Sequence, residues 1–153
     1  MNRYSSRRHK LDKQFLCEKM KNAASYDRIA GYFCSSILEV AGENIENIDG
    51  KVRVICNSNL LPEDVEVANH VQKMKQEWCE FSPEEKYTSP ESSKRLSTLF
   101  RLLSSGKLEI RVIPDEIFGL MHGKAGVITY KDGSKTSFLG SINETKSAFT
   151  LNY

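Results

Sequence analysis

The fold of this chain is restricted most narrowly by a hairpin pattern in its last third. AGVITY (125–130) and TSFLGS (136–141) are short runs of strand length, and the linker KDGSK lies between them. Asp132-Gly133 in this linker is a strong signal for a hairpin turn. We therefore expect two antiparallel strands, with the start of the first strand beside the end of the second.

Upstream of the hairpin, short apolar runs typical of strands alternate with segments of helical periodicity. The predicted strands are SYDRIAGYFCS (25–35), KVRVICN (51–57) and LEIRVIP (108–114). The predicted helices are residues 11–23, a segment opened by a capping box at Ser36 and Glu39, a segment from Pro62 to Trp78, and residues 96–103 before Gly106. SPEEKYTSPESSK (82–94) is expected to be an exposed loop. This alternation predicts an α/β domain with a mixed β-sheet flanked by helices.

Composition places the chain among folded globular proteins. Its 153 residues can bury a core, and 39% are hydrophobic and 27% charged. No apolar run approaches the roughly 20 residues of a membrane-spanning helix, so we expect no membrane partner. The four cysteines are widely spaced without a CxxC pair, which favours free thiols in a reducing, cytoplasmic compartment over a zinc site.

Positive charge is concentrated at the N-terminus. Residues 1–13 contain five basic side chains and one acidic one, and they are interpreted as a basic arm that precedes a domain at 14–153. Such an arm either contacts phosphates or is a solvated end. The chain stops at Thr-Leu-Asn-Tyr without a turn or cap, so we interpret it as part of a longer protein.

Four polar residues flank the predicted hairpin. His122 and Lys124 precede its first strand, two residues apart, and Ser141 and Asn143 follow its second strand. The hairpin would bring an imidazole, an ammonium, a hydroxyl and a carboxamide to one sheet edge. This set suits a phosphate, because the lysine and the amide donate to its oxygens and the histidine can attack phosphorus or transfer a proton.

His122-x-Lys124 followed by Gly140-Ser141-Ile142-Asn143 resembles the signature of the phospholipase D superfamily, H-x-K-x4-D followed by G-S-x-N. RIAGYF, KVRVICN and FGLMHGK resemble the phosphodiesterase domains attached to helicases and restriction enzymes. The resemblance implies that His122 is the nucleophile and forms a phosphohistidine. It also implies that Lys124 and Asn143 hold the nonbridging oxygens, that Ser141 hydrogen-bonds nearby and that Glu144 orients the histidine. The chemistry of this family requires no metal or other cofactor.

One position departs from the family pattern. The family aspartate would fall at position 129, where this chain has Thr129, and Asp132 lies in the turn as a poor substitute. Some nuclease-like branches of the family also lack this aspartate, so Thr129 does not exclude activity. The hairpin is also longer than the short family form by about four residues, which loops tolerate.

The chain contains one copy of the motif, whereas the family reaction uses two histidines. The resemblance therefore implies a homodimer with one shared active site. It further implies a nuclease that cleaves nucleic acid, expected to be DNA, ahead of a helicase or other ATPase region in a longer chain. The alternatives are a non-catalytic nucleic-acid-binding or dimerisation module and a phospholipid phosphodiesterase.

Overall fold

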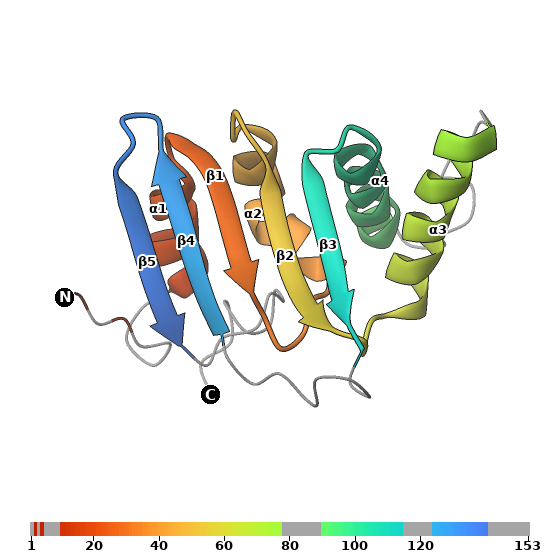
Figure 1. The fold of residues 1–153 in the computed structure, drawn as a ribbon, viewed down its shortest axis with the longest axis horizontal. Coiled ribbons are helices and arrows are strands. Elements are labelled where there is room, and N and C mark those ends of the chain that lie inside the picture. The colour runs from red at the N-terminus through yellow and green to blue at the C-terminus, as the bar shows by residue number, and fades with distance from the viewer. Residues whose placement is uncertain (1, 3, 5–9, 78–89, 115–123, 141–153) are drawn as a thin grey trace.

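A five-stranded mixed sheet forms the centre of the protein (Figure 1). We describe it from a computed structural model that covers residues 2, 4, 10–77, 90–114 and 124–140. The strands are β1 (Ala23–Ile29), β2 (Val52–Asn57), β3 (Leu108–Ile113), β4 (Lys124–Tyr130) and β5 (Lys135–Gly140), in the spatial order β3-β2-β1-β4-β5. β1, β2 and β3 are parallel, whereas β4 is antiparallel to both β1 and β5. The predicted mixed sheet is confirmed.

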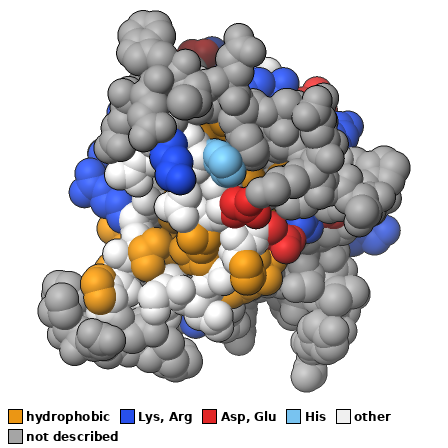
Figure 2. All heavy atoms as spheres, turned by 90° about the vertical axis from the view of Figure 1, so that its right-hand side faces the viewer, with side chains coloured by type: hydrophobic (Ala, Val, Ile, Leu, Met, Phe, Trp, Pro, Cys, Tyr) orange, Lys and Arg blue, Asp and Glu red, His pale blue; other side chains and the backbone are white. Residues whose placement is uncertain are grey.

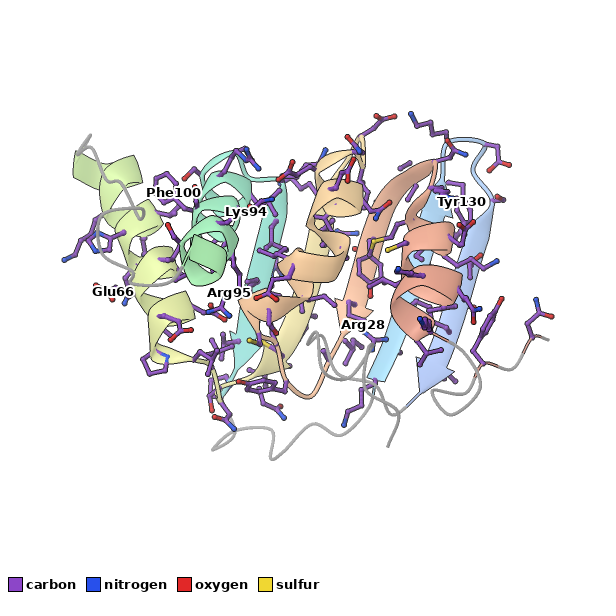
Figure 3. The ribbon with its side chains drawn as sticks, turned by 180° about the vertical axis from the view of Figure 1, so that it is seen from behind. Arg28, Glu66, Lys94, Arg95, Phe100 and Tyr130 are labelled. Carbon is purple, nitrogen blue, oxygen red and sulfur yellow. The ribbon has the colours of Figure 1, made fainter. Side chains whose placement is uncertain are left out.

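Helices cover one face of this sheet in the described part of the chain (Figures 1 and 3). They are α1 (Glu18–Met20), α2 (Leu38–Glu46), α3 (Pro62–Glu77) and α4 (Pro90–Ser104). A π-helical turn, η1 (Asp12–Cys17), precedes α1, and a 3-10 turn, η2 (Ser35–Ile37), precedes α2. The alternating residues Val52, Val54 and Cys56 of β2 are all buried beneath this layer. The core therefore lies between the sheet and its helices.

The opposite sheet face carries ion pairs and exposed apolar side chains. Arg53 of β2 pairs with Asp27 of β1, and Lys51 pairs with Glu109 of β3. Leu139 of β5 is 87% exposed. On the side of the molecule that α3 forms, charged side chains of both signs also lie among apolar ones (Figure 2).

The predicted hairpin is confirmed, and residues 131–134 join β4 to β5. The Gly133 N–H donates to the Tyr130 carbonyl at 3.0 Å, and the Tyr130 N–H donates to the Ser134 carbonyl at 2.9 Å. Gly133 has a φ of +83°, a conformation that a side chain would strain. Asp132 accepts hydrogen bonds from the backbone and the hydroxyl of Ser134. The turn is therefore fixed by both of the residues that predicted it.

Several predicted element boundaries are wrong. The helix predicted at 11–23 ends at Met20, because Asn22 adopts a φ of +62° and turns the chain into β1. The capping box at Ser36 and Glu39 does not open a helix: Ser36 lies inside η2, whose N-cap is Cys34. The predicted loop at 82–94 overlaps α4, which already begins at Pro90, and residues 82–89 lie outside the described residues.

Candidate functional site

The register of the hairpin brings the start of β4 and the end of β5 to one sheet edge. Lys124, the first residue of β4, pairs with Gly140, the last residue of β5. His122 stands two residues before Lys124 in sequence, and Ser141 directly follows Gly140. β1 and β2 end at the same edge, at the bottom of Figure 1, which we call the site edge. The strand ends are thus brought together as the sequence predicted.

Of the five predicted site residues, the structure describes Lys124. His122, Ser141, Asn143 and Glu144 lie outside the described residues. Lys124 is half-buried and lies on the same side of β4 as Gly126 and Ile128, which face the core. Its position at the site edge fits a cation that contacts an anion there.

Position 129 lies far from Lys124. Thr129 is five residues further along β4, which in a strand corresponds to about 17 Å. Because side chains alternate along a strand, Thr129 also points to the opposite face of the sheet from Lys124. An acid at position 129 would therefore not contact the same phosphate as Lys124. The threonine that stands in place of the family aspartate leaves the charge on the Lys124 side of β4 unchanged.

Arg28 is the polar residue of this neighbourhood that sequence reasoning missed. It pairs with Gly126 in the sheet, so its side chain lies on the same face as Lys124. The side chain is buried, and its guanidinium carbon lies 4.8 Å from the centre of the Phe138 ring. The signal was a charged residue of the first predicted strand at a position that alternation places on the same face as Tyr26 and Ala30.

A second polar cluster connects η2, which follows β1 in the chain, to the start of α3. The buried Asp64 carboxylate accepts a hydrogen bond of 2.8 Å from the backbone N–H of Ser35. Burial raises the pKa of Asp64 above its ordinary value of 3.8, although the Ser35 hydrogen bond and the charge of Arg95 act in the opposite direction. Burial also raises the pKa of nearby Tyr32, and the charges of Cys34 and Asp64 add to this effect. This cluster fixes the backbone beside the site edge.

One of three comparisons with known proteins found a match. The family model described as cardiolipin synthase, PLD-like domain, matches residues 16–153. A search of the curated proteins and a search of the solved structures found no match. Within the described residues, no helix has both the length and the apolar character needed to cross a lipid bilayer. Because the family match covers well over half of the chain, the protein belongs to the phospholipase D-like family, whose superfamily is of the phosphodiesterase type.

Proposed function

We propose that the domain hydrolyses phosphodiester bonds of nucleic acid through a covalent phosphohistidine at His122. The observation that supports this proposal most directly is the pairing of Lys124 with Gly140, in a chain that belongs to the phospholipase D-like family. β4 begins at the lysine of His-x-Lys, and β5 ends directly before Ser-x-Asn. The pairing therefore places these two positions side by side. This pairing supports a single site that uses both short motifs.

In the proposed reaction, a ring nitrogen of His122 attacks phosphorus, and the bond from phosphorus to the leaving oxygen breaks. The leaving oxygen takes a proton from a second histidine. Water then attacks the phosphohistidine and gives a proton to the second histidine, and cleavage of the nitrogen–phosphorus bond restores His122. Lys124 and Asn143 hold the nonbridging oxygens throughout, Ser141 donates a hydrogen bond to the same phosphate, and Glu144 orients the imidazole. These contacts stabilise the negative charge of the transition state.

The second histidine is His122 of another copy of the chain, which makes the active unit a homodimer with one shared site. Nucleic acid, and DNA in particular, is the proposed substrate because the chain resembles the nuclease-type members. The basic residues near the N-terminus would contact backbone phosphates. The proposed setting is a cytoplasmic nuclease module in a longer chain that also contains a helicase or other ATPase region.

The decisive experiment is a nuclease assay in EDTA that compares the wild type with His122→Ala. We expect the wild type to cleave DNA in the chelator and the variant to lose at least about 1,000-fold in rate, as for other removed nucleophiles. His70→Ala, which replaces a histidine of α3, is the matched control and should retain activity. DNA binding without cleavage, unaffected by His122→Ala, would instead identify a non-catalytic binding module.

A phospholipid phosphodiester is the second candidate substrate, because the matching family model carries the description of a cardiolipin synthase. The same active-site residues would serve, since the reacting group in both substrates is a phosphodiester. Parallel assays with DNA and with vesicles that contain phosphatidylglycerol or cardiolipin separate the two. Lipid turnover without DNA cleavage would replace the nuclease proposal.

A further inference from the structure

Arg28 places a permanent positive charge on the core face of the sheet. Its side chain is 3% exposed, and Figure 3 shows it in the half of β1 nearer the site edge. Burial of a charged group is costly, and most ionisable side chains respond by becoming neutral. Arginine cannot do so, because its guanidinium remains protonated in proteins. A charge of this kind needs surroundings that stabilise it.

An aromatic platform supports this guanidinium. Phe138 extends from β5 across Gly126 of β4, and the Arg28 guanidinium lies 4.8 Å from the centre of its ring, within the range of a cation–π interaction. Phe15 packs edge-on against the same ring at 5.0 Å, and Tyr26 stacks with it at 6.4 Å. The ring is held by neighbours from three elements, so it fixes the position of the charge.

The sheet register places this charge beside Lys124. Arg28 pairs with Gly126, and Lys124 is two residues before Gly126 on the same face of β4. Residues in this diagonal relation lie about 7–8 Å apart, a distance that an arginine or lysine side chain can span. This spacing of the two positions allows both positive side chains to contribute to a local field that favours an anion at the site edge.

We propose that Arg28 is a positioning residue of the phosphate site, which adds a fixed second charge beside Lys124 and so draws the phosphodiester to the site edge. This inference rests on the proposed function, because it assigns Arg28 to the same phosphate. The opposing view is a purely structural arginine whose only role is to pack against Phe138. The two views differ in what they predict for phosphate affinity in a folded variant.

The test measures phosphate affinity and diester cleavage in Arg28→Met, Arg28→Lys and the wild type. Titration calorimetry gives the Kd of inorganic phosphate, and hydrolysis of bis(p-nitrophenyl) phosphate in EDTA gives KM and kcat. We expect Arg28→Met to raise both the Kd and the KM about tenfold, because one of the two charges that attract the phosphate is removed, and Arg28→Lys to recover part of the loss. Arg101→Met removes the same charge from an exposed position of α4 and should change neither value more than about twofold.

A cooperative thermal transition shows whether each variant folds. If Arg28→Met does not fold, Arg28→Lys and Phe138→Leu decide the question. Phe138→Leu keeps both cations but removes the platform, and we expect it to raise the Kd of phosphate as well. Folded Arg28 variants with the phosphate Kd and the KM of an active wild type would overturn the inference and leave the proposed function intact. A wild type that neither cleaves the diester nor binds phosphate would overturn both.

Discussion

At position 126, the absence of a side chain allows residues of three strands to meet. A Cβ atom on Gly126 would lie 2.4 Å from Cζ of Phe138 and 2.6 Å from one of its Cε atoms, well inside van der Waals contact. The bare backbone lets the Phe138 ring cross β4 and reach Arg28 and Tyr26 on β1. A glycine at position 126 therefore leaves the space that the Phe138 ring occupies.

We expect Gly126→Ala to destabilise the protein by about 1–3 kcal/mol, the usual cost of overpacking in a well-packed core. Urea unfolding gives the change in free energy. The control is the same substitution in a Phe138→Leu background, where the ring that causes the clash is gone. The cycle should show a coupling energy between the two positions, since they are in direct contact. Equal effects of Gly126→Ala in both backgrounds would contradict this packing.

At the scale of elements, a buried hydrogen bond joins η2 to the first turn of α3. Asp64 accepts from the Ser35 N–H, and one oxygen of its carboxylate, Oδ1, is buried without a hydrogen-bond partner among the described residues. The raised pKa of Asp64 means that the folded state binds a proton at this carboxyl more readily than the unfolded state does. The contact therefore fixes the chain after β1 in a way that depends on pH.

Asp64→Ala should destabilise the fold by about 1–3 kcal/mol, because the buried Ser35 N–H loses its acceptor. Asp64→Asn keeps an acceptor oxygen and should cost much less, which makes it the matched control. With a raised folded pKa, the contribution of Asp64 to stability is fully present below the unfolded pKa and is lost as pH rises through the folded pKa. Unfolding of wild type and Asp64→Asn from pH 4 to pH 8 should therefore show the wild type losing stability relative to the variant. The opposite slope would contradict the raised pKa.

Local signals in the sequence predicted some elements well and others poorly. Asp132-Gly133 and Pro62 act through their own backbone preferences, so the hairpin turn and the start of α3 are where the sequence placed them. Ser36 failed as a helix start because η2 already begins at Ser35, and Cys34 is its N-cap. Pro90 was assigned to a loop, although proline is well suited to the first turn of a helix.

At the scale of the whole molecule, the candidate site depends on the order of strands, which no local pattern determines. The hairpin alone predicted that Lys124 and Gly140 lie together, and this is confirmed. The insertion of β4 beside β1 brings Arg28 to the same place, and it results from pairing between segments about 100 residues apart. Arg28 could therefore be identified as unusual in the sequence, but its neighbour across the sheet could not. The roles of His122, Lys124, Ser141, Asn143 and Glu144 remain predictions.

The proposed shared site makes a prediction about mixed dimers. If each active site uses His122 from both copies, a dimer with one wild-type chain and one His122→Ala chain is inactive. After random exchange of equal amounts, about one quarter of the dimers contain two wild-type chains. Activity per dimer should therefore fall to about one quarter of the wild-type value. Independent sites in each chain would leave one half.

The measurement is diester hydrolysis after refolding the two chains together, and wild type refolded with Arg101→Met is the control, since exchange with an active chain should not reduce the rate. Sedimentation velocity on the same samples must show the dimer, and a monomer with full activity would exclude the shared site.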